Sequence, residues 1–329
     1  MPGVWQISRD APSPACDPGT VSDRTAYLAA EGYVDELARE LGRVDRGHGR
    51  LLIASGPPRT AAWAANVWLD PQEIRIASIS DAAAKLSPIQ RNWALYAPKL
   101  YRRATLIQEQ LPKVSAKPHV FGAAPPVAPL GSWTLLDAET VLAAPHCTSP
   151  FPNGEIDFVE DRNGPPSRAY LKLWEALTLL GCRPEPSETC LDLGSSPGGW
   201  SWALQQMGAR VISVDKAPLA PEIARLPRIE HRLESAFALD PRAIGPVDWV
   251  FSDVVCYPAR LLALVERWLA PTGHARGLKD HGTCRRFVCT IKFQGETDHQ
   301  TARRFAAIPG AQLRHLFHNK HELTWIKIG

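Results

Sequence analysis

The stretch Cys190-Leu-Asp-Leu-Gly-Ser-Ser-Pro-Gly-Gly-Trp-Ser-Trp202 decides the fold class. It predicts a short apolar strand, then a glycine turn, then an apolar helix that begins at once. Asp192 lies just before the turn. Glycines let a backbone approach a ligand closely, and in open α/β sheets ligands lie outside the carboxyl ends of the strands. The segment therefore predicts a pocket for a small cofactor that carries positive charge.

The spacing of this turn favours S-adenosylmethionine over a dinucleotide. A nicotinamide site has G-x-G-x-x-G with a pyrophosphate at the helix N-terminus, whereas this turn has Asp192-x-Gly194-x-x-x-Gly198-Gly199. Asp192 would repel a pyrophosphate and would suit the ammonium group of a methionine moiety. A second carboxylate, Asp215, ends the next apolar strand, where it can bind the ribose hydroxyls of an adenosine. The alternative at this point is an ordinary strand-to-helix turn with surface acids.

Composition limits the class of protein. The chain has 329 residues, so two domains are expected. It has no apolar run long enough for a membrane span and no signal pattern at its start. Seven scattered cysteines without a C-x-x-C pair fit a reducing cytoplasm and no metal site. The net charge of +3 neither requires nor excludes nucleic acid.

The periodicity divides the chain into an α+β domain over residues 1–150, a linker over 151–166 and a second domain over 167–329. The first residues, to about 25, are rich in proline and polar residues and are expected to be poorly ordered. The N-terminal elements that the pattern predicts are a helix at 27–41, strands at 51–54, 62–68 and 74–79, a helical stretch at 88–111 interrupted at Pro98, and strands at 133–137 and 140–144.

After the linker, strands and helices alternate, which predicts a mostly parallel sheet. Two strands separated by a short polar turn close the chain, and they place the last strand antiparallel. This order is typical of Rossmann-like class I S-adenosylmethionine-dependent methyltransferases. The expected strands are 189–193, 210–214, 229–233, 248–252, 287–292, 312–317 and 323–328, with helices at 168–180, 200–207, 259–269 and 298–307.

Four ionisable residues lie where such elements begin or end: Lys172, Asp253, Lys292 and Glu322. Singly, each is most simply a solvated charge at the end of an element. A lysine at the end of an apolar strand is costly, however, unless it is paired or lines a cleft. Burial and a neighbouring cation lower the pKa of a lysine and make it a competent base. Together the four could deprotonate a hydroxyl and hold it in line with a methyl donor.

On these motifs residues 167–329 resemble the FtsJ-type ribose 2′-O-methyltransferases, and within them the RlmM group, which acts on large-subunit ribosomal RNA. The segments that carry the resemblance are Ser167-Arg-Ala-Tyr-Leu-Lys172, the glycine turn to Trp200, Ser252-Asp253, Lys292 and Glu322. The resemblance implies a Lys-Asp-Lys-Glu tetrad with S-adenosylmethionine as cofactor and RNA as partner. It also implies an N-terminal domain that binds RNA through THUMP and ferredoxin-like modules.

The resemblance implies a role for each tetrad member. Lys292 would take the proton from the ribose hydroxyl and Asp253 would orient it, while Lys172 would hold the hydroxyl oxygen and Glu322 would hold Lys172. Ser235 stands where the family often has an acid for the adenine amino group, so Glu234 or a backbone carbonyl would substitute. The cofactor-binding residues that follow are Asp192, Gly194, Ser195, Ser196, Pro197, Gly198, Gly199, Trp200, Asp215, Glu234, Ser235 and Asp253.

Two other functions remain open from the sequence. Cys256 follows Asp253 at the spacing used by cytosine carbon-5 RNA methyltransferases, and Cys289 lies on the next strand, where a thiolate could attack a base. The chain could also be a non-catalytic RNA-binding protein with a methyltransferase fold. RNA contact itself is suggested by basic and aromatic residues interleaved over 91–103. Five basic residues could add positive field around the cleft: Arg285, Arg286, Arg303, Arg304 and Lys320.

Overall fold

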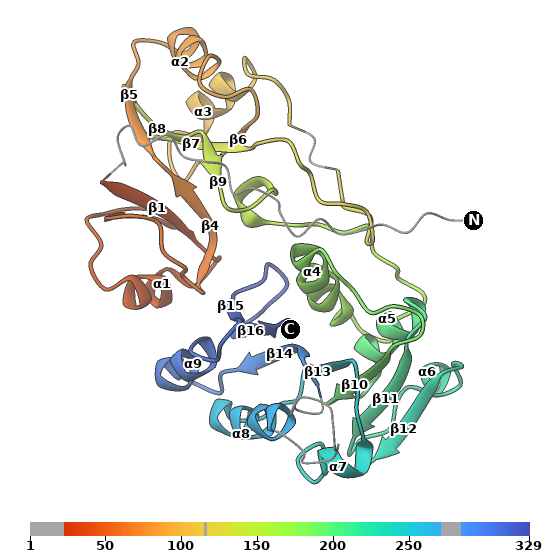
Figure 1. Ribbon diagram of the computed structural model, residues 1–329. Coiled ribbons are helices and arrows are strands. Elements are labelled where there is room, and N and C mark those ends of the chain that lie inside the picture. The colour runs from red at the N-terminus through yellow and green to blue at the C-terminus, as the bar shows by residue number, and fades with distance from the viewer. Residues whose placement is uncertain (1–22, 115–116, 271–283) are drawn as a thin grey trace.

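The computed structural model describes residues 23–114, 117–270 and 284–329, which form three β-sheets with helices packed against them (Figure 1). The poor order expected near the start falls mostly on residues 1–22, outside the described residues. Within the described ranges, every helix is too short or too polar to cross a lipid bilayer.

Two smaller sheets form the N-terminal part. Their strands are β1 Arg24–Ala29, β2 Arg46–His48, β3 Leu51–Ser55, β4 Ala64–Leu69, β5 Gln72–Arg75, β6 Trp93–Leu95, β7 Gly131–Asp137, β8 Thr140–Ala144 and β9 His146–Cys147. The strand orders are β2-β3-β1-β4-β9 and β5-β8-β7-β6. Helix α1 (Val34–Leu41) packs on the first sheet, and α2 (Ile79–Leu86) and α3 (Tyr101–Gln108) pack on the second.

Three of the expected N-terminal elements are wrong. The helix expected over 27–41 is β1 followed by α1, because alternate residues of β1 are buried on opposite faces and its part within that range, Tyr27 to Ala29, has no polar residue that would mark a solvent-facing side. The strand expected at 74–79 ends at Arg75, and Ser78 then caps α2 by accepting a hydrogen bond from the Asp81 amide. The helix expected from residue 88 begins only at Tyr101, and the residues before it include β6, whose backbone pairs with β7.

The third sheet has the strand order expected of a class I methyltransferase. Its strands are β10 Thr189–Leu193, β11 Arg210–Asp215, β12 Ile229–Leu233, β13 Trp249–Ser252, β14 Arg286–Lys292, β15 Ala311–Arg314 and β16 Glu322–Lys327. They follow the order β12-β11-β10-β13-β14-β16-β15. Only β16 runs antiparallel to its neighbours, so the fold class that the sequence predicted is confirmed.

Helices cover both faces of this sheet. They are α4 Tyr170–Leu180, α5 Gly199–Gln206, α6 Pro221–Ala224, α7 Pro241–Ile244, α8 Pro258–Leu269 and α9 His299–Ala306. Side chains alternate between the two faces of a strand. Phe251, Val288 and Ile326 therefore pack on the side of α4 and α5, whereas Phe287 and Trp325 pack on the side of α8 and α9.

The N-terminal part is joined to the third sheet by a buried contact and not only by the chain. The segment expected to be a linker contains a short 3-10 turn, η1 Pro152–Gly154, and three of its apolar side chains are buried against α4: Phe151, Ile156 and Phe158. Figure 1 also shows α1 and β4 facing α9 and β15. There Glu36 of α1 lies 2.9 Å from the His299 imidazole of α9.

Candidate active site

The alternation of side chains brings three ionisable residues to one face of the sheet. Asp253 lies two residues beyond Phe251, and Lys292 lies four residues beyond Val288, so both are on the α4 side. Glu322 is the register partner of Lys292 across the β14–β16 pair and shares that face. Helix α4 packs on the same face and contributes Lys172 from its first turn. The structure thus collects four side chains that are far apart in the sequence.

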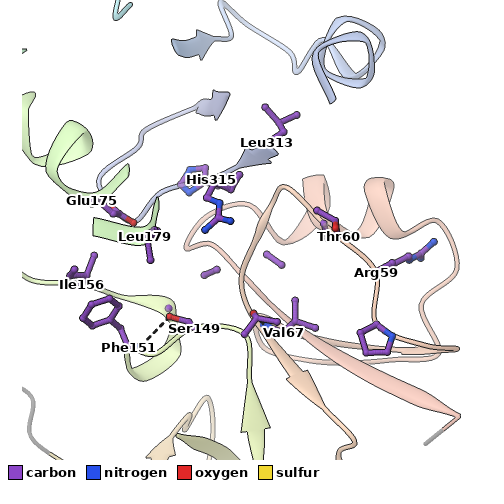
Figure 2. A pocket seen from close by; sticks show the side chains of 17 residues that line it. Arg59, Thr60, Val67, Ser149, Phe151, Ile156, Glu175, Leu179, Leu313 and His315 are labelled. Atoms are coloured by element: carbon purple, nitrogen blue, oxygen red, sulfur yellow. Dashed lines mark hydrogen bonds between the residues drawn. The ribbon is translucent and has the colours of Figure 1, made fainter. Parts of the chain in front are cut away.

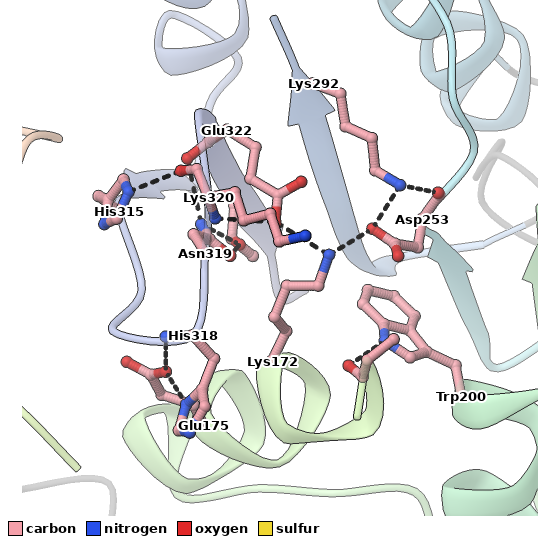
Figure 3. A network of polar contacts seen from close by, with 12 residues as sticks. Lys172, Glu175, Trp200, Asp253, Lys292, His315, His318, Asn319, Lys320 and Glu322 are labelled. Atoms are coloured by element: carbon pink, nitrogen blue, oxygen red, sulfur yellow. Dashed lines mark hydrogen bonds and ion pairs between the residues drawn. The ribbon is translucent and has the colours of Figure 1, made fainter. Parts of the chain in front are cut away.

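The four groups form a continuous ionic cluster (Figure 3). Lys172 Nζ donates to Asp253 Oδ1 and to Glu322 Oε1, each at 2.9 Å. Lys292 Nζ lies 3.2 Å from the same Asp253 oxygen and donates to the Asp253 backbone carbonyl at 2.5 Å. Lys292 has the most exposed side chain of the four, at 20 %, and Glu322 the least, at 8 %. Lys292 is therefore the more exposed of the two lysines of the cluster.

Lys172 is held as a cation. Burial disfavours its charged form, but the Asp253 and Glu322 carboxylates outweigh burial, and the pKa of Lys172 is raised above its ordinary value. The general expectation that burial would make a lysine here less basic is therefore wrong for Lys172. A fixed cation cannot serve as a base near neutral pH, but it can hold an oxygen that carries negative charge.

A second set of hydrogen bonds fixes the loop between β15 and β16. Glu175, one turn after Lys172 on α4, is 2 % exposed. Its carboxylate accepts hydrogen bonds from the amides of Phe317 and His318 and lies 2.7 Å from His318 Nδ1. The Lys320 amide then donates to Glu322 Oε1 at 3.3 Å. Helix α4 thus positions both ends of the loop that leads into Glu322 (Figure 3).

The glycine turn after β10 is closely packed against the segment that follows β13. Gly194 has φ +77°, and a Cβ added there would lie 2.5 Å from Val254 Cα. Gly198 has φ +117°, a conformation that side-chain-bearing residues rarely adopt. Gly199 lets the segment before α4 approach, because a Cβ there would lie 2.8 Å from Ser167 Oγ. These glycines keep the carboxyl edge of β10 open beside Asp253.

Asp192 is buried on the α5 side of β10. Its Oδ2 accepts a hydrogen bond from Ser201 Oγ at 2.6 Å, and Ser201 in turn lies 2.9 Å from Ser213 Oγ. Its Oδ1 has no hydrogen-bond partner within the described part of the chain. Burial raises the pKa of Asp192 to about 7, with smaller contributions from the Asp253 and Asp215 carboxylates. A bound cation near this carboxyl would favour its ionised form.

Other buried oxygens nearby also lack partners among the described residues. Ser195 Oγ and Ser252 Oγ are both buried and unpaired, and both lie where a strand ends at the carboxyl edge. Unpaired buried polar atoms are costly, and ligands commonly satisfy them. With the glycine turn and the Asp192 carboxyl, they form a donor and acceptor set that fits the amino-acid end of S-adenosylmethionine.

Asp215 joins this turn to β11. Its Oδ2 accepts from the Ser196 amide at 3.0 Å and its Oδ1 from the Ala217 amide at 2.9 Å. Ser196 Oγ donates to the Pro218 carbonyl, and the Pro197 carbonyl accepts from the Ala220 amide. Each carboxylate oxygen keeps a second lone pair, so Asp215 remains able to accept from a ribose hydroxyl.

The remaining expected cofactor residues lie at the rim of this region or behind it. Trp200 is buried, and its indole donates to the Ala169 carbonyl at 2.8 Å, so it fastens α5 to the start of α4. Glu234 and Ser235 are half-buried just beyond β12. The Ser235 hydroxyl accepts from the Phe237 amide at 3.3 Å.

The cysteines are poor nucleophiles in this structure. Burial raises the pKa of Cys256 to about 11 and raises that of Cys289 further. Cys289 is fully buried on the α8 side of β14, away from the ionic cluster. Because the thiolate is the reactive form, these values oppose a carbon-5 mechanism. The residues that the structure describes also contain no group of three or more His, Cys, Asp and Glu side chains that could hold a metal ion.

A separate cavity of about 370 Å³ lies between β4, the segment before α4, and β15 (Figure 2). Arg59, Thr60, Ser149, Glu175 and His315 are among its lining residues. The tetrad does not line it. This cavity therefore belongs to the junction between the N-terminal part and the third sheet, not to the ionic cluster.

Residues 165–269 match the family model described as FtsJ-like methyltransferase. The predicted resemblance to the FtsJ-like family is confirmed. This FtsJ-like region contains Lys172, the glycine turn and Asp253, whereas Lys292 and Glu322 lie beyond it. The match supports S-adenosylmethionine as the cofactor of the edge described above.

Curated relatives carry the name Ribosomal RNA large subunit methyltransferase M. The protein of Halorhodospira halophila is 43% identical over 122 residues, covering 36% of this chain and 35% of that protein. The protein of Azotobacter vinelandii is 32% identical over 200 residues, covering 56% and 53%. The aligned part of this chain thus spans about a third to a half of the length of these relatives.

Solved structures show only distant similarity. The C-terminal domain of precorrin-6Y C5,15-methyltransferase from Rhodobacter capsulatus is 22% identical, covers 50% of this chain and 92% of that domain, and superposes with a TM-score of 0.32. The assignment of the fold therefore depends on the strand order of the third sheet and on the FtsJ-like family match.

Two contacts of the site were not expected from the sequence. Ser201, whose hydroxyl donates to Asp192, lies within the glycine-turn segment 190–202. The sequence indicates it only as a hydroxyl residue on an otherwise apolar face of the expected helix. The Glu175 carboxylate fixes the β15–β16 loop. Its position three residues after Lys172, on the same face of the expected helix, is the one feature of the sequence that could have indicated this contact.

The substitution Asp192→Asn is expected to change how stability depends on pH. The folded-state pKa of about 7 lies above the ordinary value of 3.8. The folded state therefore binds this proton more tightly, and stability falls as pH rises from about 4 to about 7. Asparagine does not ionise, so the variant does not lose stability in this way as pH rises. Its free energy of unfolding should exceed that of the wild type by roughly 2–4 kcal/mol above pH 7 and by little at pH 4.

Urea unfolding at pH 4.5 and pH 8 measures this difference. Asp35→Asn on α1 serves as the control, since the carboxylate that it removes is exposed to solvent and not buried. An equal difference between wild type and Asp192→Asn at both pH values would contradict the burial of an ionisable Asp192.

Proposed function

We propose that this protein is an S-adenosylmethionine-dependent RNA methyltransferase that modifies a ribose 2′-hydroxyl, in large-subunit ribosomal RNA. The observation that carries the proposal is the Lys172 ammonium group between the Asp253 and Glu322 carboxylates, with Lys292 on the same aspartate. The FtsJ-like match and the names of the curated relatives support the same reaction class.

The cofactor would lie along the carboxyl ends of β10, β11 and β12. When bound, S-adenosylmethionine supplies an electrophilic methyl group. Asp192 and the backbone of the glycine turn would hold its amino-acid end, and Asp215 would accept from its ribose hydroxyls. Glu234 or Ser235, after β12, would lie beside the adenine. This assignment draws on the unpaired Asp192, Ser195 and Ser252 oxygens described above.

Each tetrad residue would have a different role at the acceptor hydroxyl. Lys292, the more exposed of the two lysines, would release one proton to solvent, and its neutral amine would then accept the proton from the 2′-oxygen while Asp253 orients it. Lys172 would hold the developing alkoxide with its fixed positive charge, and Glu322 would keep Lys172 in place. This arrangement favours a sugar hydroxyl over a ring carbon as the proposed methyl acceptor.

The N-terminal part is proposed to bind RNA. We propose the division into a domain over residues 1–150, a connecting segment over 151–166 and the methyltransferase domain over 167–329, acting in the cytoplasm. Fewer aromatic rings of the segment 91–103 are available to stack on RNA bases than the sequence suggested, because Trp93 and Tyr96 are buried in the core. Tyr101, which is 66% exposed, and Arg102 remain on the surface at the start of α3.

Replacing Lys292 with methionine is expected to lower the rate of methyl transfer by roughly 10²–10⁴-fold, since the proton acceptor is removed. Cofactor affinity should change little, because Lys292 makes no contact with the glycine turn. Labelled methyl transfer to ribosomal RNA, followed by alkaline hydrolysis, measures the product, because a 2′-O-methyl group makes the adjacent phosphodiester resistant to alkali.

The control is Lys327→Met. It removes a lysine at the end of β16 opposite to Glu322 and should leave the rate of methyl transfer normal. Label released as alkali-sensitive nucleotides would assign the methyl group to a base and overturn the ribose assignment. Cofactor binding without transfer to any RNA would favour the non-catalytic alternative.

The double variant Cys256→Ala/Cys289→Ala should retain most of the transfer activity, because both thiols have raised pKa values and neither belongs to the ionic cluster. The same assay and a melting temperature measure this. A stable double variant without transfer would instead support a cysteine-based carbon-5 mechanism.

Charge reversal at Arg102 and Arg103 should weaken RNA binding and leave cofactor binding intact. If both contact phosphates, the slope of log affinity against log salt should fall by about 1.5. Arg39→Glu/Arg43→Glu, on and after α1, makes the same change in net charge elsewhere. Equal loss in both double variants would show an effect of overall charge and would exclude a local RNA contact at α3.

A further inference from the structure

An aromatic cluster joins the N-terminal part to the strand ends that carry the tetrad. The Tyr33 ring stacks on His321, with centroids 5.7 Å apart and planes inclined by 16°. Tyr33 also packs against Trp63 at 4.9 Å and His315 at 4.8 Å. Phe293 completes the cluster, 6.0 Å from Trp63 and 5.4 Å from His321. Two of these rings come from the N-terminal part and three from the third sheet.

Two of the rings from the third sheet are direct neighbours of tetrad residues in the chain. Phe293 follows Lys292 in the chain, and His321 precedes Glu322. The Phe293 amide donates to the His321 carbonyl at 3.2 Å, which extends the pairing of Lys292 with Glu322 by one step. A shift of His321 would therefore move both strand ends from which Lys292 and Glu322 project.

His315 makes a second connection from the same cluster. Its amide donates to the Ala62 carbonyl at 2.6 Å. Burial lowers the pKa of His315 to about 4, so the ring is neutral near pH 7. Its Nε2 lies 2.9 Å from the Lys320 carbonyl, which can only accept, so Nε2 carries the proton. The Lys320 amide then donates to Glu322 Oε1.

The N-terminal side of the cluster is rigid. Trp63 is 1% exposed, and its amide and that of Ala62 donate to the Glu40 carboxylate at 3.0 and 2.7 Å. The Trp63 carbonyl accepts from the Ala30 amide at 3.0 Å. Tyr33, by contrast, is half-buried at the start of α1, so its ring can be changed without opening a large cavity.

We propose, on the basis of the proposed function, that Tyr33 is a positioning residue for methyl transfer. Its ring, supported by Trp63, holds His321 and through it the carboxylate of Glu322 against Lys172. The phenol is within electrostatic reach of the cluster, since burial and then the Glu322 carboxylate raise the pKa of Tyr33. The N-terminal part then completes the active site in addition to binding RNA.

Two variants separate the ring from its hydroxyl. Tyr33→Ala should lower the single-turnover rate at saturating RNA and cofactor by roughly 10–100-fold, because small displacements of catalytic groups are costly. The KM for RNA and the affinity for S-adenosylmethionine should stay unchanged. Tyr33→Phe keeps the ring and should restore the rate. Ile74→Ala on β5, which removes a half-buried N-terminal side chain outside this cluster, should leave the saturated rate unchanged.

Amide hydrogen exchange provides a readout that needs no activity. Tyr33→Ala should speed exchange at Phe293 and Glu322 and leave the amides of β10 and β11 unchanged. Unchanged exchange at Phe293 and Glu322 would overturn the proposal, as would a raised KM with an unchanged rate, which would make Tyr33 an RNA contact. A Tyr33→Phe variant as slow as Tyr33→Ala would also overturn it.

The two proposals fail in distinguishable ways. If the wild-type protein transfers no methyl group to any RNA, the proposed function is wrong, and the exchange measurement still reports whether Tyr33 holds the strand ends. If the wild type is active and Tyr33→Ala is equally fast, only the positioning role is wrong.

Discussion

The Lys172 ammonium group, held between two carboxylates from different strands, is the interaction on which the rest of the site depends. Its two 2.9 Å contacts tie the first turn of α4 to the end of β13 and to the start of β16. Burying an ion is costly, and removing one partner of a buried pair leaves the other charge uncompensated. The sheet, α4 and the closing hairpin must therefore keep one relative position, and this same position brings Lys292 beside Asp253.

Sequence patterns predicted the third sheet closely and the N-terminal part poorly, for a physical reason. The parallel strands are buried on both faces and read as short apolar runs between glycine and proline turns, as at β10 and β11. In the N-terminal part, β1 is also buried on both faces, but only residues 30–33 separate it from an amphipathic helix, so the apolar pattern predicted one helix over both elements. Pairing between β6 and β7, which no local pattern encodes, overrode the helical pattern near Trp93.

The four residues of the ionic cluster could be selected from the sequence because each lies at or near the end of an element whose other residues are mostly apolar. The side chains that set its geometry could not be found in this way. Tyr33 acts across a junction between segments nearly three hundred residues apart, and Glu175 acts through the backbone of a loop. Such contacts depend on the packing of complete elements. The local amino-acid sequence around Tyr33 does not differ from that at the start of many half-buried helices, so it gives no indication of this contact.

The position of β16 as the last strand of the fold has a consequence for protein synthesis. Lys172 and Glu322 lie 150 residues apart in the chain. A nascent chain that has emerged from the ribosome as far as β14 already has the strands and the glycine turn of the cofactor edge. It still lacks the carboxylate that neutralises Lys172, which leaves that ammonium group with one acidic partner. Translation of the β15–β16 hairpin is thus the step that completes the charge balance around Lys172, after the strands of the cofactor edge have already been made.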